Sequence, residues 1–320
     1  ALSGGKRSTM SARPVLRFAP SPNGELHLGH ALSALTGFDM AERLGGRFLV
    51  RIEDIDITRC REDYVTGIFE DLAWLGIAWE EPVLRQSARF MTYSAASDWL
   101  LKLGLLYPCF ATRAEIAEAT QTATAPPPLD PDGTPLYPGL HKTLPKEEIA
   151  ARLSRNEPFA LRLDMDRALD ALEGITGRRC ISFTEIDADG NGERIEMDPA
   201  DWGDAVIVRK DVPASYHLAV TVDDARQGVT HVTRGHDLYA ATSLHRLLQI
   251  ILGLPEPLYH HHRLLTDAHG HKLSKSAGAP SLRTLRAHGL DGLQIRHRVG
   301  LECNAPEEPL GYDRVVGNLS

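Results

Sequence analysis

Residues 14–30 read PVLRFAPSPNGELHLGH, and this stretch decides the fold of the N-terminal part of the chain. The apolar run PVLRFA predicts a short buried strand, and PSPNG after it is a turn cluster. Helical spacing of apolar residues then continues from His27 to Leu44, where two glycines end it. Because Phe48–Ile52 is a second apolar run, the order strand–helix–strand predicts a parallel βαβ unit.

The rest of the chain extends this α/β pattern. Residues 120–145 hold 7 of the 20 prolines and predict an irregular insertion, and residues 159–200 are expected to be mostly β-structure. We expect a Rossmann-type parallel sheet with an insertion at about 107–200, followed by a small, mainly helical C-terminal segment. The expected boundaries are 1–12 (disordered), 13–254 (catalytic) and 255–320. Helices are predicted at 62–75, 87–103 and 239–252, and strands at 205–208, 216–222 and 229–233.

Composition excludes several classes of protein. The chain has 320 residues, 42% of them hydrophobic, which is typical of a globular protein. No apolar run is long enough for a membrane span, and residues 1–10 lack the apolar stretch of a signal peptide. Four cysteines fit a reducing compartment, and we expect a cytoplasmic protein. The net charge of −8 disfavours a general polyanion binder, but residues 226–320 carry a net +3 and 10 of the 14 histidines.

The sequence His27-Leu28-Gly29-His30 lies where a helix is expected to begin after a strand and turn. Backbone N–H groups and the positive end of the helix dipole favour phosphate binding there. Two histidines three residues apart share a helix face, so both can donate hydrogen bonds to an α-phosphate. Gly29 leaves room for a nucleoside. The pattern alone is weak, because histidine pairs at this spacing are common.

A second candidate motif is Lys272-Leu273-Ser274-Lys275-Ser276, bounded by glycines on both sides. Two lysines in such a loop suit a clamp that neutralises a departing pyrophosphate. An exposed basic loop is the ordinary alternative for this segment taken by itself.

Together the two motifs resemble the signature pair of class I aminoacyl-tRNA synthetases. RFAPSPNGELHLGH at 17–30 resembles the opening of the glutamyl-tRNA synthetase group, as do RIEDID at 51–56 and GVTHVTRG at 228–235. The resemblance covers about residues 14–290. It implies an ATP site formed by His27, Gly29, His30, Lys272, Ser274 and Lys275, with His27, His30, Lys272 and Lys275 as the catalytic residues.

The number of residues after the KLSKS motif indicates which branch of this family the chain resembles. Only 44 residues follow Ser276, too few for the anticodon-binding region of a bacterial glutamyl-tRNA synthetase. A catalytic core without that region resembles the glutamyl-Q tRNA(Asp) synthetase branch. That branch activates L-glutamate with ATP without tRNA, and then transfers it to queuosine at the wobble position of tRNA(Asp). We expect weak, salt-sensitive tRNA binding.

The resemblance also implies a glutamate site. Burying a dicarboxylate requires cationic partners, and a guanidinium fork fits a carboxylate. Parallel strands would bring Arg17 and Arg234 to one crevice at their carboxyl ends. The resemblance assigns Glu53 to the substrate ammonium, and Ser21 and Tyr216 to hydroxyl hydrogen bonds.

Three patterns suggest metals. Zinc in the related enzymes is held by a Cys-x-Cys pair, a Tyr and a later Cys; here Cys109 and Tyr137 remain, but Ala111 and His141 replace two cysteines. We therefore expect zinc to be absent or weakly bound. DADGNG at 187–192 imitates a calcium loop, but its flanks predict a hairpin turn. The side chains of HHH at 260–262 are not expected to converge on one ion, because adjacent side chains diverge along an extended segment. We expect a loop near the adenine end of the ATP site there.

The predicted reaction is adenylation followed by acyl transfer, with Mg²⁺ carried in by the phosphates. Three alternatives stay open at this point: a truncated synthetase that charges tRNA(Glu), a non-catalytic paralogue, and a nucleotidyltransferase or pantothenate-type ligase of the same fold.

Overall fold

The structure is a computed structural model that describes residues 13–122, 125–266 and 280–301. The predicted disordered segment 1–12 and the residues Lys272, Ser274 and Lys275 lie outside the described residues. The predicted domain boundaries stay a prediction.

A parallel sheet organises the molecule, as the sequence predicts. Strands β1 (Val15–Phe18), β2 (Arg47–Ile52) and β3 (Glu80–Arg85) pair in that order, all parallel. Strand β9 (His231–Gly235) pairs in parallel with β10 (Leu258–His262). The N–H of Thr230 donates to the carbonyl of Val15 at 2.9 Å, which places β9 beside β1. Consecutive strands thus diverge from β1 toward opposite sides, the arrangement of a doubly wound sheet.

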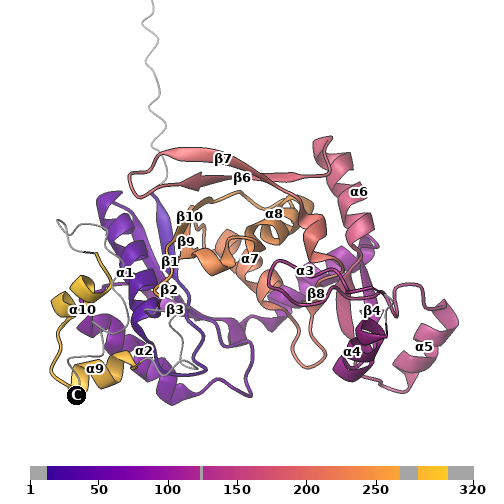
Figure 1. Ribbon diagram of the computed structural model, residues 1–320, viewed down its shortest axis with the longest axis horizontal. Helices are drawn as coiled ribbons and strands as arrows, with labels where there is room; N and C mark the ends of the chain where they lie inside the picture. Colours follow the sequence, from indigo (N-terminus) through magenta and orange to yellow (C-terminus); the bar gives the residue numbers. More distant parts are fainter. Residues whose placement is uncertain (1–12, 123–124, 267–279, 302–320) are drawn as a thin grey trace, which may run out of the picture.

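Helices cover this sheet (Figure 1). Helix α1 (Leu28–Arg43) packs on β1, β2 and β9, and α7 (Tyr216–Arg226) packs on α3 and α8. The remaining helices of this part are α2 (Glu62–Trp74), α3 (Phe90–Lys102), α8 (Ala241–Leu252), α9 (Leu282–Ala287) and α10 (Gly292–Arg298), with 3₁₀ turns at Gln86–Ala88, Pro199–Trp202 and His236–Leu238.

A smaller antiparallel sheet lies at the other end of the molecule (Figure 1). Its strands are β4 (Leu106–Cys109), β5 (Ala160–Leu163) and β8 (Val206–Val208), in that order. Around it lie helices α4 (Arg113–Gln121), α5 (Lys146–Ser154) and α6 (Met165–Thr176).

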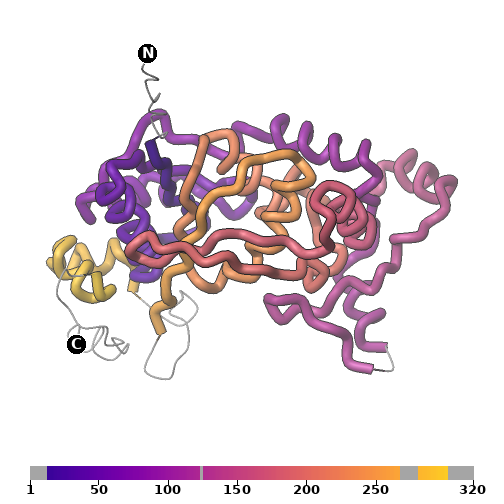
Figure 2. The backbone as a smooth tube through the Cα atoms, turned by 90° about the horizontal axis from the view of Figure 1, so that it is seen from above, coloured from indigo at the N-terminus to yellow at the C-terminus, as the bar shows by residue number. Residues whose placement is uncertain are grey.

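Strands β6 (Ile181–Ile186) and β7 (Gly192–Met197) form the hairpin predicted at DADGNG. The carboxylate of Asp187 accepts hydrogen bonds from the backbone of Asp189 and Asn191, at 2.9 and 2.8 Å, so it caps the turn. The hairpin extends along one side of the molecule (Figures 1 and 2), and β6 joins the main sheet beside β10.

Three sequence predictions of secondary structure are wrong. Helix α6 occupies part of the segment expected to be β-rich; Asp164 caps its start, and Gly177 ends it at a positive φ of 74°. Residues 216–222 form the start of α7, not a strand. This helix is buried over Leu218–Asp224, so its sequence lacks an amphipathic period. HHH belongs to strand β10 instead of a loop.

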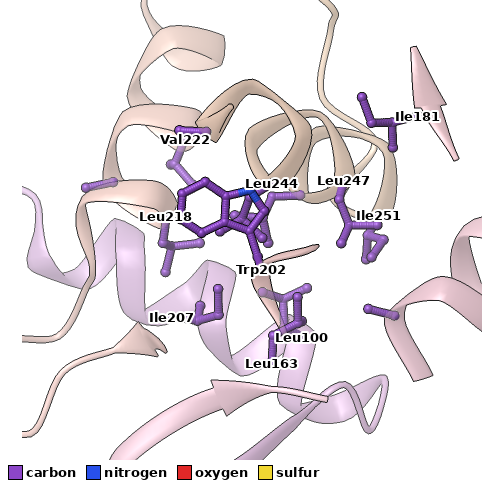
Figure 3. Packing of buried hydrophobic residues seen from close by; sticks show 14 of the residues in the cluster. Leu100, Leu163, Ile181, Trp202, Ile207, Leu218, Val222, Leu244, Leu247 and Ile251 are labelled. Carbon is purple, nitrogen blue, oxygen red and sulfur yellow. The ribbon is translucent and has the colours of Figure 1, made fainter. Parts of the chain in front are cut away.

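The larger hydrophobic core lies where α7 and α8 meet α3 and the small sheet. Trp202 stands at its centre in Figure 3, surrounded by leucine, isoleucine and valine side chains of several elements. Its indole N–H donates to Ser243 Oγ at 2.9 Å, so the polar edge of this buried ring is satisfied. None of the helices in the described part is both long and apolar enough to cross a membrane.

Candidate active site

A cavity of about 650 Å³ opens at the carboxyl ends of β1 and β9, where the strand order diverges. Ligands of doubly wound sheets bind at this position. The cavity collects every predicted substrate residue within the described chain. Its lining includes Arg17, Ser21, His27, Gly29, His30, Glu53, Tyr216 and Arg234.

The two histidines of HLGH form the start of α1. His27 is the N-cap, and its Nδ1 accepts a hydrogen bond from the N–H of Gly29 at 3.1 Å. His30 Nδ1 accepts from the N–H of His27, also at 3.1 Å. Since each Nδ1 is an acceptor, a neutral ring carries its proton on Nε2. The ring centroids are 3.9 Å apart, so two N–H donors lie side by side at a helix N-terminus.

Gly29 is required by close approach to the first of these rings. A Cβ on Gly29 would lie 3.0 Å from Cε1 and 3.1 Å from Nδ1 of His27. These separations are tighter than ordinary packing allows, so a side chain there would displace the ring. The sequence predicts that Gly29 leaves room for a nucleoside. The structure adds that it also leaves room for the ring of His27.

Arg17 lies on β1 and is held by a buried acid on α7. Its Nε and Nη2 donate to the two carboxylate oxygens of Asp224, at 2.9 and 3.1 Å. Arg51, on β2, donates to the same carboxylate at 2.7 Å and to Glu53 at 3.2 Å. Burial favours the neutral carboxylic acid, but the two guanidinium groups outweigh it and lower the pKa of Asp224. One carboxylate therefore fixes two arginines and, through Arg51, orients Glu53.

Glu53 follows β2 directly and faces the cavity. Burial raises its pKa, while Arg51 and Arg17 act against that rise. A buried carboxylate in this position has little solvent around it, and a substrate ammonium would give it a second cationic partner beside Arg51.

Tyr216 is the first residue of α7, whose N-cap Ser215 accepts from the N–H of Leu218 at 3.4 Å. The helix start, not a strand, brings its ring to the cavity. Burial raises the pKa of the Tyr216 phenol, so it is a neutral hydrogen-bonding group. Ser21 lies in the exposed turn after β1.

Arg234 lies near the end of β9 and is buried. Its Nε donates to His261 Nε2 at 3.1 Å, its Nη1 to His245 Nδ1 at 3.0 Å, and its Nη2 to Thr242 Oγ1 at 2.7 Å. Arg17 and Arg234 thus meet in one cavity as predicted, but the environments of their guanidinium groups differ.

Sequence reasoning missed the partners of both arginines. Asp224 and His245 were not singled out as site residues. A signal for each was present: two consecutive acids in an otherwise apolar segment, and one histidine within the apolar run of α8.

The predicted lysine clamp lies outside the described residues, but its flanks are described. Leu265, just before it, is buried and lines the cavity. After it, Ser281 forms an isolated antiparallel bridge with His27, and the N–H of Leu282 donates to the carbonyl of Leu26 at 2.8 Å. The described residue after this segment, Ser281, thus lies beside His27, and Leu265 before it lies at the same cavity.

The degenerate zinc residues come together at the small sheet. Cys109 Sγ donates to Tyr137 Oη at 3.3 Å, and His141 Nδ1 accepts from the backbone N–H groups of Phe110 and Ala111, both at 3.0 Å. Each group thus has a protein partner. Within the described residues, no cluster of three or more His, Cys, Asp or Glu side chains is placed to hold a metal ion. Weak or absent zinc binding stays a prediction.

Comparison with known proteins agrees with the class that the doubly wound sheet and the HLGH site indicate, the class I aminoacyl-tRNA synthetases. The family of class I tRNA synthetases (E and Q), catalytic domain, matches residues 15–297, and the chain belongs to it. The glutamyl-Q tRNA(Asp) synthetase of Rhodobacter capsulatus is 44% identical over 90% of this chain and 100% of its own length. That of Symbiobacterium thermophilum is 40% identical over 85% of this chain and 81% of its own.

A solved structure confirms the predicted fold class. The glutamate-tRNA synthetase of Elizabethkingia anophelis superposes with a TM-score of 0.68 and 29% identity, over 83% of this chain. The match spans only 53% of that longer protein.

Proposed function

We propose that the chain activates L-glutamate with ATP, without tRNA, and transfers the glutamyl group to queuosine at the wobble position of tRNA(Asp). One observation carries the proposal: a single cavity holds paired histidine donors at a helix start together with Arg17, Glu53 and Arg234. The two glutamyl-Q relatives, matched over most of their own length, support the choice of acceptor. A cytoplasmic location is part of this proposal.

The amino-acid end of the cavity offers charged groups of both signs. Arg17 and Arg234 supply the cations that a dicarboxylate needs, and Glu53 supplies an anion for the ammonium group. The hydroxyls of Ser21 and Tyr216 complete the amino-acid end. Glutamate thereby satisfies three charges in a largely buried site.

The histidines lie at the ATP end. An α-carboxylate oxygen of glutamate attacks the α-phosphorus, and the bond from that phosphorus to the oxygen bridging to the β-phosphate breaks. Glutamyl-adenylate forms, and pyrophosphate leaves. The Nε2–H groups of His27 and His30 stabilise the charge that develops on the α-phosphate. Lys272 and Lys275 neutralise pyrophosphate; in support, Leu265 before their segment lines the cavity, and Ser281 after it pairs with His27.

Mg²⁺ is expected to arrive on the ATP phosphates. The described residues offer it no cluster of three acidic or imidazole ligands, and magnesium commonly uses few protein ligands beside substrate phosphates. Its contribution when bound is to neutralise phosphate charge.

Glutamate-dependent exchange of pyrophosphate into ATP, measured without tRNA, tests the activation step. We expect exchange with L-glutamate and much less with L-glutamine or L-aspartate. Absence of exchange with glutamate contradicts the proposal. Faster exchange with glutamine would show that glutamine, and not glutamate, is the amino acid that the chain activates.

The acceptor is tested with radiolabelled glutamate and three RNAs. We expect transfer to tRNA(Asp) bearing queuosine, and none to the same tRNA with unmodified guanosine at the wobble position. Transfer to tRNA(Glu) at a comparable rate shows that the chain is a tRNA(Glu)-charging enzyme instead.

A further inference from the structure

Arg234 differs from the other buried arginines of the site in the partners of its guanidinium group. Three of its N–H groups donate to neutral acceptors on β10 and α8: His261, His245 and Thr242. The guanidinium makes no ion pair with an Asp or Glu of residues 13–122, 125–266 or 280–301. Arg17, by contrast, donates two hydrogen bonds to Asp224.

The imidazole of His261 is fixed in one neutral form by its surroundings. Glu185, on β6, accepts hydrogen bonds from its backbone N–H at 2.7 Å and from its Nδ1 at 2.8 Å. Nδ1 therefore carries the proton, and the lone pair of Nε2 faces Arg234. A protonated Nε2 would lose this hydrogen bond and place a second positive charge on the guanidinium.

His245, on α8, takes the opposite tautomer. Its Nδ1 accepts from Arg234, so its proton lies on Nε2, which is 3.1 Å from Nδ1 of His217. His217 therefore accepts, and the chain Arg234–His245–His217 has one consistent direction of donation. Burial and the charge of Arg234 lower the pKa of both histidines.

A guanidinium has five N–H donors, and these contacts use three. One N–H on Nη1 and one on Nη2 remain for a ligand at the cavity. In a buried site an uncompensated cation attracts a carboxylate far more strongly than it attracts a neutral amide. A pre-existing carboxylate beside Arg234 would cancel much of that difference.

We infer that His245 and His261 are positioning residues that hold Arg234 through neutral acceptors and leave its charge uncompensated, so that the cavity selects an amino acid with an anionic side chain over its amide. His217 and Glu185 set the tautomers of the two rings. The inference rests on the proposed function, because it assigns to Arg234 the side-chain carboxylate of glutamate.

Two substitutions of one residue isolate the charge. His245→Asn and His245→Asp both place a short side-chain oxygen acceptor near Nη1 of Arg234, and they differ in one negative charge. At pH 8, where His217 stays neutral, we expect the KM for glutamate in pyrophosphate exchange to be about tenfold or more higher in H245D than in H245N. The KM for ATP should be the same in both. Equal KM values for glutamate would overturn the inference.

Two controls separate the local charge effect from a change in net charge and from misfolding. His288→Asp changes net charge by the same kind of substitution at an exposed position, the C-cap of α9, and should leave both KM values unchanged. Thermal unfolding shows whether each variant is folded. A protein that is folded but shows the same loss of glutamate affinity in H245N and H245D would assign His245 a purely structural role.

A second measurement needs no substrate. In the wild-type protein labelled with ¹⁵N at histidine, the ring-nitrogen shifts at pH 7 should report neutral His245 with its proton on Nε2 and neutral His261 with its proton on Nδ1. A protonated ring at either position would overturn the inference. If the wild type activates no glutamate, the proposed function fails, and these shifts still decide whether Arg234 is held by neutral rings.

Discussion

Arg17 on β1 and Asp224 on α7, 207 residues apart in the chain, share two hydrogen bonds of 2.9 and 3.1 Å inside the protein. The same carboxylate accepts from Arg51 at 2.7 Å. Arg17 and Asp224 are buried, and Arg51 has no exposed side-chain surface. This arrangement makes Asp224 the common support of the two arginines at one side of the cavity.

Replacing Asp224 by Asn is expected to affect stability and substrate binding together. The change leaves two buried guanidinium groups without their carboxylate, and breaking a buried pair in this way costs about 3–5 kcal/mol. Urea unfolding measures that loss. Because Arg17 loses its orientation, we also expect the KM for glutamate to rise about tenfold or more.

Asp223→Asn is the matched control for that variant. Asp223 is the neighbouring buried acid, but its partners are Tyr93, Gln86 and Arg89, none of which lines the cavity. We expect it to lower stability and to leave the KM for glutamate unchanged. If both variants raise that KM equally, the effect belongs to α7 as a whole and not to the Arg17–Asp224 contact.

Substituting Gly29 by Ala should slow activation without weakening glutamate binding. The new Cβ would lie 3.0 Å from Cε1 of His27, so the ring must shift by a few tenths of an ångström, and we expect this shift to misalign its Nε2–H with the α-phosphate. Losing one aligned donor to a transition-state oxyanion costs about 10²–10³ in rate. We expect kcat for pyrophosphate exchange to fall toward that range, with little change in the KM for glutamate.

Gly67→Ala is the matched control for Gly29→Ala, because it makes the same change in a helix where no described side chain is in the way. Gly67 lies within α2, and a Cβ there meets nothing within 4 Å. Its replacement should raise the free energy of unfolding by about 0.5–1 kcal/mol and leave exchange unchanged. Unaltered exchange in G29A would show that the start of α1 tolerates a displaced His27.

The sequence predicted the parts of the fold that local patterns specify. Strand β1, helix α1 and strand β2 follow from apolar spacing and the terminal glycines, and parallel strands then bring Arg17 and Arg234 to one crevice. Helix α7 was predicted as a strand because it is buried over Leu218–Asp224 and lacks an amphipathic period, while Val220–Val222 is a run of β-branched residues typical of a strand. Strand β10 was predicted as a loop near the ATP site, because three consecutive histidines lack the alternation of apolar and polar residues that marks a half-buried strand.

The support of the two arginines could not be predicted in the same way. Asp224 is 207 residues from Arg17, and His245 is only 11 from Arg234 but on another element, so no local period links either cation to its acceptor. Only the packing of α7 and α8 against the sheet decides which arginine faces a carboxylate and which faces neutral rings. That difference leaves Arg234, and not Arg17, with a guanidinium charge that no carboxylate of the described residues contacts.

Arg234→Ala should abolish glutamate activation and leave ATP binding largely intact. The substitution removes the uncompensated cation from the amino-acid end, and leaving a buried charge without its partner costs about 2–5 kcal/mol, or roughly 1.5 to 3.5 powers of ten in kcat/KM. Pyrophosphate exchange measures the first effect, and equilibrium binding of ATP measures the second. A modest loss of glutamate exchange would show that Arg17 supplies the main carboxylate contact.

The buried histidines predict that stability falls in weak acid. Burial, with the charge of Arg234, lowers the pKa of His217 and His261 from 6.5 to about 4. The unfolded chain therefore binds more protons than the folded protein between these values. By linkage, the stability is complete above pH 6.5 and is lost as the pH falls toward 4, by up to about 3 kcal/mol per histidine.

Thermal unfolding between pH 7 and 5 tests this dependence, and His217→Asn is the comparison. Asp71 acts with the opposite sign in this range, because burial raises its pKa to about 6, so the folded protein holds a proton there that the unfolded chain has lost. Since Asp71 is common to both proteins, the difference between their slopes isolates His217. We expect a smaller fall in Tm for H217N; parallel curves would mean that His217 becomes charged as readily in the folded protein as in the unfolded chain.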